Sequence, residues 1–144
     1  MKIGVIHGPN INFLGTRQPE VYGNMSFAEV CGRIQALACK DLEIVQFQSN
    51  CEGEIVDFIQ RCHSEEFSGL VINPAAFAHY SYAIADALAS ISPPVIEVHL
   101  TNIAAREEFR QKSVTAAACI GQISGFGVDS YLLAIKYLIS LGGI

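Results

Sequence analysis

Short apolar runs alternate with segments of helical periodicity along the whole chain. Five runs have the length and apolar content of buried strands, the last more weakly than the others: residues 2–7, 42–48, 69–72, 95–98 and 116–123. Apolar residues spaced three and four apart predict helices after Ser26, after Ser49, over 80–91, over 104–109 and after Gly127. The chain is therefore a series of strand–helix units.

Alternating strands and helices are typical of a parallel sheet that carries helices on both faces. With right-handed crossovers, they predict a flavodoxin-like doubly wound α/β fold with a five-stranded parallel sheet of order 2-1-3-4-5. The length of 144 residues fits a single domain, 1–144. Residues 11–25 show no clear period and contain Gly15, Pro19 and Gly23, so we expect an active-site lid at about 11–25.

Two of the predicted helices begin with a capping signal. Ser26 is followed three residues later by Glu29, and Ser49 is followed three residues later by Glu52. In a capping box, the serine side chain accepts from the backbone N–H of the third residue, whose carboxylate returns a hydrogen bond. We therefore expect both serines to be N-caps.

Composition narrows the class of protein without identifying it. Hydrophobic residues make up 51% and charged residues 16%, which excludes a disordered chain and suggests apolar surface hidden in an oligomer. The net charge of −5 argues against a nucleic-acid-binding surface. No apolar run reaches the length of a membrane span and the N-terminus starts directly as a strand, so we expect a cytoplasmic protein without membrane contact.

Cysteines and histidines show no metal-binding pattern. The five cysteines are odd in number and include no Cys-x-x-Cys pair, so we interpret most of them as small core residues. The four histidines are scattered, without the spacing of metal ligands. We expect no metal and no cofactor.

Polar residues gather where the predicted strands end. In doubly wound sheets, ligands bind outside the carboxyl ends of the strands, near the switch point between the first and third strands. The first, third and fourth predicted strands are followed by polar residues: Asn10, Asn73, His79, His99 and Thr101. The lid and the segment after the fourth strand add Arg17, Tyr22, Arg106 and Arg110. We therefore predict acid–base chemistry on a small anion at this edge of the sheet.

Each of these residues also has a purely structural interpretation. Asn10 and Asn73 are common in Asx turns, which is the better interpretation for a lone asparagine. We interpret Arg106 as part of a solvated helix face, because glutamates follow it directly. His7 could be a buried histidine with satisfied hydrogen bonds, and Tyr22 could simply pack under its loop. The convergence of several polar strand ends carries the prediction, rather than any single side chain.

Longer blocks of sequence extend this pattern over the whole chain. Residues 8–23, which contain most of the lid, follow the motif Gly-Pro-Asn-Ile-Asn-Phe-Leu-Gly-x-Arg-x-Pro-x-x-Tyr-Gly. Further blocks follow in order: 47–54, 72–79, 96–110 and 125–127. In length and order these blocks resemble the signature of the type II 3-dehydroquinate dehydratases. The match is far more specific than a lone glycine-rich loop.

The resemblance implies a hydro-lyase of the shikimate pathway, which leads to chorismate and the aromatic amino acids. Such an enzyme converts 3-dehydroquinate to 3-dehydroshikimate. A proton leaves C2, next to the ketone, and the C1 hydroxyl then departs as water from the enolate. The resemblance also implies a homo-oligomer, a dodecamer built from trimers, in which Asp86 reaches a neighbouring subunit's site.

The resemblance assigns the chemical steps to the lid and the fourth strand. Tyr22 helps to remove the C2 proton as a phenolate, and because a free tyrosine has a pKa of about 10, a cation must stabilise it; Arg17 is the candidate. Asn10 holds the enolate oxygen through a water, and His99, supported by Glu97, protonates the leaving hydroxyl. Residue types alone do not decide between base and acid, and His99, with a reference pKa of about 6.5, is the easier base.

The resemblance assigns substrate binding to other residues. Asn73 orients the leaving hydroxyl. The backbone N–H groups of Leu100 and Thr101, with the Thr101 hydroxyl, hold the carboxylate. His79 and Arg110 bind the ring hydroxyls. The unrelated type I enzymes instead use a lysine Schiff base, and we expect none of the four lysines of this chain in the pocket.

Several positions depart from the family pattern next to the predicted pocket. Ala75 and Ala78 stand where Gly and Thr or Ser are common, Tyr80 replaces a common Thr, and Ala104 replaces a common His. Thr101 replaces a frequent Ser but keeps the hydroxyl. These changes bear on affinity and subunit contacts more than on the reaction.

Three other functions fit the same fold class. A signalling receiver domain needs acidic residues after the first strand, where this chain has His7 and Asn10. A flavin-binding electron carrier needs a Ser/Thr-rich phosphate loop there, which this chain lacks. A binding protein that kept the pocket but lost turnover stays open, and a direct assay of turnover distinguishes it.

Overall fold

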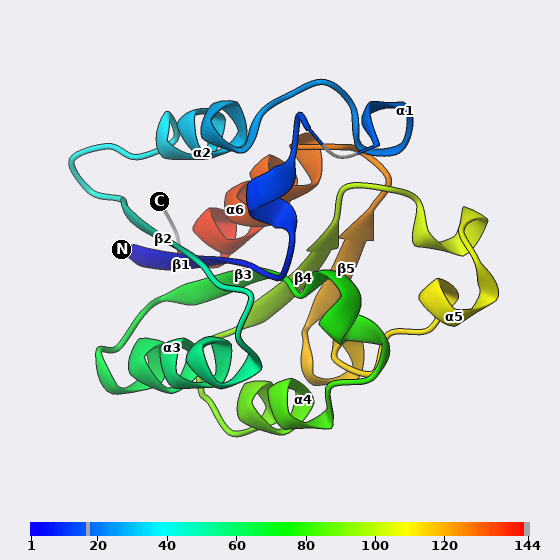
Figure 1. Ribbon diagram of the computed structural model, residues 1–144. Coiled ribbons are helices and arrows are strands. Elements are labelled where there is room, and N and C mark those ends of the chain that lie inside the picture. The colour runs from blue at the N-terminus through cyan, green and yellow to red at the C-terminus, as the bar shows by residue number, and fades with distance from the viewer. Residues whose placement is uncertain (17, 143–144) are drawn as a thin grey trace.

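A five-stranded parallel sheet forms the centre of the computed structural model, which describes residues 1–16 and 18–142 (Figure 1). The strands lie in the order β2-β1-β3-β4-β5. Their bounds are Lys2–His7 (β1), Glu43–Gln48 (β2), Gly69–Asn73 (β3), Val95–His99 (β4) and Gly121–Ser124 (β5). The predicted doubly wound, flavodoxin-like architecture and its strand order are confirmed.

Helices cover both faces of the sheet, α2 and α6 on one face and α3 and α4 on the other (Figure 1). Their bounds are Phe27–Gln35 (α2), Glu52–Ser64 (α3), Tyr82–Ala89 (α4) and Asp129–Leu141 (α6). The loops carry shorter turns: Ile11–Phe13 (η1), Pro19–Tyr22 (α1), Ala75–His79 (η2), Ile103–Ala105 (η3), Glu108–Gln111 (α5) and Ala116–Ala118 (η4). Within the described ranges, no helix is long and apolar enough to cross a bilayer.

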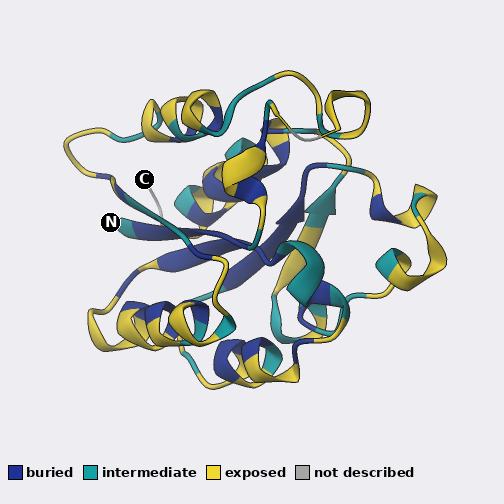
Figure 2. Cartoon of the chain, in the orientation of Figure 1, coloured by how far each residue is buried: buried dark blue, intermediate teal, exposed yellow. Residues whose placement is uncertain are grey.

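The two faces of β1 pack into two separate cores. Ile3 and Val5 belong to the cluster under α2 and α6, whereas Ile6 belongs to the cluster under α3 and α4. This follows because successive strand residues point to opposite faces of the sheet. All three side chains are fully buried, and each contributes roughly 1.5–3 kcal/mol to folding. Most of the strands at the centre of the sheet are coloured as buried in Figure 2. A strand buried on both faces has a continuous run of apolar residues, which is why β1 was predictable from the sequence.

One of the two predicted capping boxes forms. The Ser26 side chain accepts from the N–H of Glu29, whose carboxylate accepts from the N–H of Ser26. The prediction for Ser49 is wrong, because the N-cap of α3 is Cys51 and it makes no side-chain capping bond. The Ser49 hydroxyl instead hydrogen-bonds the Glu54 carboxylate and accepts from the N–H of Cys51.

Two predicted elements are wrong in extent. The helix over 104–109 is split, because Arg106 has an extended backbone between η3 and α5. The strand over 116–123 begins only at Gly121, and residues 116–118 form a 3-10 turn. Tertiary contacts hold the chain at both places: Arg106 donates to Tyr22 and Thr101, and Ser113 and Thr115, just before the turn, donate to Glu97.

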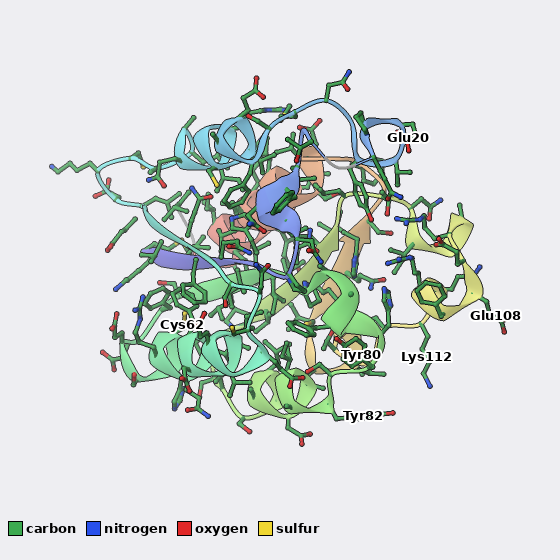
Figure 3. The ribbon with its side chains drawn as sticks, in the orientation of Figure 1. Glu20, Cys62, Tyr80, Tyr82, Glu108 and Lys112 are labelled. Carbon is green, nitrogen blue, oxygen red and sulfur yellow. The ribbon has the colours of Figure 1, made fainter. Side chains whose placement is uncertain are left out.

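The cysteines divide between core and surface. Cys62 is buried on α3 (Figure 3), and Cys31 and Cys119 are partly buried. Cys39 and Cys51 are exposed and are the two that lie outside the core.

Candidate active site

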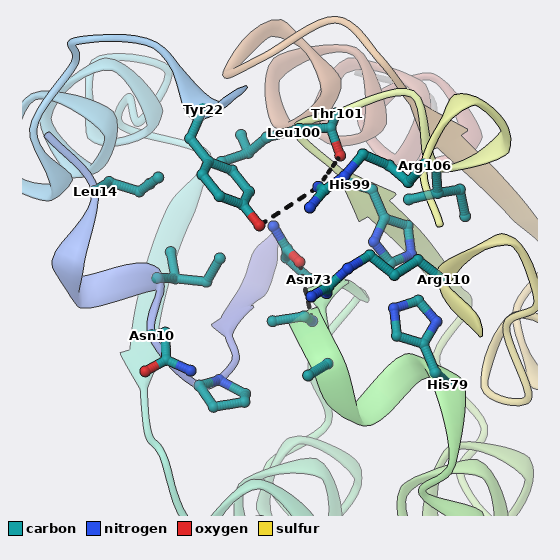
Figure 4. A pocket seen from close by; sticks show the side chains of 15 residues that line it. Asn10, Leu14, Tyr22, Asn73, His79, His99, Leu100, Thr101, Arg106 and Arg110 are labelled. Carbon is teal, nitrogen blue, oxygen red and sulfur yellow. Dashed lines mark hydrogen bonds between the residues drawn. The ribbon is translucent and has the colours of Figure 1, made fainter. Parts of the chain in front are cut away.

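A cavity opens at the carboxyl ends of β1, β3 and β4, the edge predicted from the strand order (Figure 4). Arg106 and Arg110 line it together with two histidines, and no acidic side chain of the described residues does so. The cavity is therefore cationic, although the whole chain carries a net charge of −5. This local reversal of charge favours a small anionic ligand.

The floor of the cavity is made by two closely packed turns. The N–H of Gly8 donates to the Asn73 carbonyl at 2.8 Å, and a Cβ on Gly8 would lie 2.7 Å from the carbonyl carbon of Pro74. Only glycine fits such an approach. The Asn73 Oδ1 accepts the N–H of Ala75 at 3.1 Å. Asn73 thus makes the predicted Asx turn and also lines the cavity.

Asn10 lines the opposite rim, at the start of the lid (Figure 4). Its φ of 67° lies in the left-handed region, which asparagine adopts more readily than most residues. Its side chain does not cap the turn η1 that follows, and its N–H donates to the Asn50 Oδ1 at 2.9 Å. Asn10 therefore lines the cavity without using its side chain as a cap.

A buried histidine–glutamate hydrogen bond lies behind the cavity. The Nε2 of His99 donates to the Glu97 Oε1 at 2.7 Å, and both side chains are almost completely buried. Ser113 and Gln122 donate to the same oxygen at 2.7 Å and 2.8 Å, and Thr115 donates to Oε2 at 2.5 Å. Burial would raise the pKa of Glu97, but the hydrogen bonds from His99, Thr115 and Ser113 hold that pKa below its ordinary value.

An ionised Glu97 determines how His99 faces the cavity. A carboxylate only accepts hydrogen bonds, so the Nε2 of His99 carries a proton and its Nδ1 is the nitrogen left for a ligand. The carboxylate also stabilises the imidazolium form of His99 when Nδ1 is protonated. His99 can therefore give a proton to a ligand or take one from it.

His79 and Arg110 form the far wall of the cavity and point inward (Figure 4). The Nδ1 of His79 donates to the backbone carbonyl of Lys112 at 2.9 Å, so a neutral His79 presents Nε2 as an acceptor. Arg110 is held from outside by Glu107, whose carboxylate lies 3.0 Å from its Nε. The wall therefore offers one acceptor and several donors, which suits hydroxyl groups.

Tyr22 reaches across the cavity from α1 to Arg106 (Figure 4). The Nη1 of Arg106 donates to the Tyr22 hydroxyl at 3.4 Å and to the Thr101 hydroxyl at 3.3 Å. The guanidinium carbon also lies 5.5 Å from the centre of the Tyr22 ring. The interpretation of Arg106 as part of a solvated helix face is therefore wrong.

The structure brings together most of the residues predicted for the site. The cavity is lined by all but three of them: Asn10, Tyr22, Asn73, His79, His99, Leu100, Thr101 and Arg110. Glu97 lies directly behind His99. Asp86 lies on the exposed side of α4 and does not line this cavity. Arg17 lies outside the described residues.

Arg106 lines the cavity although sequence reasoning preferred a solvated helix face for it, because glutamates follow it directly. Its place beside Arg110, in the segment after the fourth strand, was the signal that pointed to the site. None of the four lysines lines the cavity. Among the described residues, no cluster of three or more His, Cys, Asp or Glu side chains could hold a metal ion.

Comparisons with known proteins agree with this geometry. The family model described as dehydroquinase class II matches residues 1–139. The chain is 55% identical over 139 residues to a 3-dehydroquinate dehydratase of Clostridium beijerinckii, covering 96% of this chain and 95% of that protein.

Solved structures point to the same family. A type II dehydroquinase from Butyrivibrio crossotus superposes with a TM-score of 0.94 at 49% identity, over 96% of this chain and 97% of that one. A type II dehydroquinase from Propionibacterium acnes gives a TM-score of 0.92 at 39% identity, over 96% of each chain. With these matches over nearly its full length, the chain belongs to the class II dehydroquinase family.

Proposed function

We propose that this chain is a type II 3-dehydroquinate dehydratase, a hydro-lyase that converts 3-dehydroquinate to 3-dehydroshikimate in the shikimate pathway. Relatives 55% and 54% identical to it carry the name 3-dehydroquinate dehydratase. The observation that carries the proposal is the pairing of a tyrosine with an arginine above a buried histidine–glutamate pair. These groups supply a base and an acid on opposite sides of one small cavity.

Tyr22, as a phenolate, takes the proton from C2 of the substrate. The resulting enolate carries its charge on the former ketone oxygen, and Asn10 holds that oxygen through a water. Arg106 supports the phenolate, since its Nη1 already donates to the Tyr22 hydroxyl at 3.4 Å. Arg17, on the same lid, adds a second positive charge. Removal of a proton next to a ketone needs such a charge-stabilised base at neutral pH.

His99 completes the elimination. Its protonated Nδ1 gives a proton to the C1 hydroxyl, the C1–O bond breaks, and water leaves while the enolate electrons form the C1–C2 double bond and restore the ketone. Glu97 stabilises the imidazolium that makes this transfer, through the hydrogen bond of 2.7 Å from His99 Nε2. The proton on Tyr22 returns to His99 through solvent, so the net change is loss of one water.

The remaining groups hold the substrate in place. The Thr101 hydroxyl accepts from Arg106, which leaves its own hydrogen free to donate to the substrate carboxylate beside the backbone N–H groups of Leu100 and Thr101. His79 accepts from one ring hydroxyl through Nε2, and Arg110 donates to another. Asn73 orients the departing hydroxyl. The whole chain, 1–144, acts as one catalytic domain, with residues 11–25 as the lid that carries Tyr22.

The assembly we propose is a cytoplasmic dodecamer of trimers. Asp86 and Tyr82 share one face of α4, four residues apart, and Tyr82 is 70% exposed (Figure 3). Next to β5, Ile120 and Phe126 are 56% and 64% exposed. Exposed apolar side chains of this size mark a surface for contact with other subunits. In such a contact Asp86 reaches the neighbouring cavity.

The test is the appearance of ultraviolet absorbance after 3-dehydroquinate is added, because the product is a conjugated enone. We expect turnover by the wild-type protein and a loss of at least 100-fold in kcat for Tyr22→Phe, which removes the base. Binding of 3-dehydroquinate without turnover would refute the activity, and nearly unchanged kcat would remove Tyr22 from the mechanism. Borohydride added with substrate should leave activity intact, since no lysine lines the cavity.

A further inference from the structure

Two buried polar residues beneath the cavity have no part in the steps above. His7 and Tyr131 are both fully buried, and the His7 Nδ1 lies 2.9 Å from the Tyr131 hydroxyl. His7 stands opposite Asn73 in the register of β1 and β3, so both side chains point toward the face covered by α6. The two residues therefore lie directly under the amide that faces the substrate.

The hydrogen bonds at the far end of this group have a defined direction. The Gln46 amide nitrogen donates to the Cys31 carbonyl at 3.0 Å and to the Gln35 Oε1 at 3.2 Å. The Gln46 Oε1 is therefore the atom that lies 3.2 Å from the His7 Nε2. Because an amide oxygen only accepts, the His7 Nε2 must carry the hydrogen. Burial lowers the pKa of His7 to about 4, so His7 is neutral and its Nδ1 carries no hydrogen. The Tyr131 hydroxyl must then donate to His7.

The same direction continues to Asn73. Because the Tyr131 hydroxyl hydrogen is used on His7, its oxygen can only accept. Asn73 lies beside His7 in the strand register, and although burial raises the pKa of Tyr131, a hydrogen bond from the Asn73 side chain lowers it, as a donor to this oxygen does. The Asn73 Oδ1 is already occupied by the N–H of Ala75 at 3.1 Å. The Asn73 nitrogen therefore gives one hydrogen to Tyr131 and has the other for the cavity. A flipped amide would place its nitrogen against the N–H of Ala75.

We propose that His7 and Tyr131 are positioning residues, which fix the Asn73 amide so that its N–H, rather than its oxygen, faces the hydroxyl that leaves the substrate. This inference rests on the proposed dehydration. As the C1–O bond breaks, negative charge develops on the departing oxygen, and an N–H donor stabilises that charge whereas a carbonyl oxygen repels it. Gln46 anchors the chain of hydrogen bonds at its other end.

The test is a double-mutant cycle between Tyr131→Phe and Asn73→Ala, read by kcat and KM for 3-dehydroquinate. We expect Tyr131→Phe to lower kcat about tenfold to 100-fold with KM within about threefold, since the removed hydroxyl acts through a transition-state donor. In the Asn73→Ala background, the same substitution should change kcat less than twofold. Tyr137→Phe, the same change at an exposed position of α6, is the matched control and should leave kcat unchanged.

A merely structural role gives a different result. If Tyr131→Phe reduces kcat by the same factor in both backgrounds, or by less than twofold in the wild type, the proposal is wrong. Should Tyr131→Phe fail to fold, Gln46→Leu replaces it in the same double-mutant cycle, because Gln46 is only half-buried. Gln46→Leu should lower kcat when Asn73 is present and leave kcat unchanged in the Asn73→Ala background. The wild-type protein is assayed first. If it does not turn over 3-dehydroquinate, the dehydratase function is refuted, which is a different result from a failed test of how Asn73 is positioned.

Discussion

Glu97→Gln separates the charge of the buried carboxylate from its shape. Glu97 Oε1 accepts from His99, Ser113 and Gln122, whereas Oε2 accepts only from Thr115. A glutamine can keep its oxygen at the crowded position and point its nitrogen at Thr115, whose hydroxyl can turn to accept and donate to Ser113 at 3.1 Å. We therefore expect the variant to fold and to lose the negative charge alone.

The size of the effect follows from the His99 contact. A hydrogen bond to a charged group is worth about 1.5–3 kcal/mol, and at about 1.36 kcal/mol per factor of ten its loss corresponds to a kcat roughly 10- to 150-fold lower. Ser113→Ala, which removes one neutral donor from the same oxygen, should cost less than about tenfold. The assay is the rate of enone formation at saturating substrate. A kcat for Glu97→Gln within threefold of wild type, with unchanged thermal stability, would refute the role of the charge.

Three further predictions follow from single contacts. Arg106→Met should lower kcat roughly tenfold to 100-fold, since it removes the donor to Tyr22 and Thr101; equal losses of kcat in the exposed control Arg33→Met would contradict this. Because folded His7 has a pKa of about 4 against 6.5 unfolded, the unfolded chain binds an extra proton between these values. Folding stability should therefore be full above pH 6.5 and fall by roughly 3 kcal/mol towards pH 4 in urea unfolding. His7→Leu should flatten this slope and the exposed His63→Gln should not; an unaltered slope in His7→Leu would exclude His7 as its source. Ala75 has a φ of +50°, so Ala75→Gly should stabilise the fold by up to about 1 kcal/mol. This would raise the midpoint of thermal unfolding; a lower midpoint would show that the strain is compensated.

The strands and the fold class were predictable because they depend on local patterns. Strands buried on both faces must be continuous in apolar residues, as in the β1 run Ile3-Gly4-Val5-Ile6. The N-terminus of α2 was predictable for a similar reason, since a capping box needs only residues three apart. Ser49 has the same spacing but is buried at the end of β2, where its hydroxyl bonds Glu54 and the N–H of Cys51. At Ser49, these tertiary contacts take the place of the capping bonds that the spacing to Glu52 predicts.

Arg106 shows most clearly what local patterns leave undecided. A regular helix over 104–109 would have fitted the residue types, but the extended backbone at Arg106 breaks the helix and leaves its side chain between Tyr22 and Thr101. These partners are 84 and 5 residues away in sequence, so the pairing with Tyr22 exists only after the lid and the segment following β4 have met.

By itself, the sequence determined most of the strands and helices, and through strand order it determined which polar residues arrive at one edge of the sheet. Only the tertiary structure decided the partners and the direction of their hydrogen bonds: Arg106 for Tyr22, four donors for Glu97, and Tyr131 with His7 beneath Asn73. The physical reason is that secondary structure depends on apolar spacing within a few residues. A buried polar group must instead be satisfied by whatever donors and acceptors the completed fold places beside it.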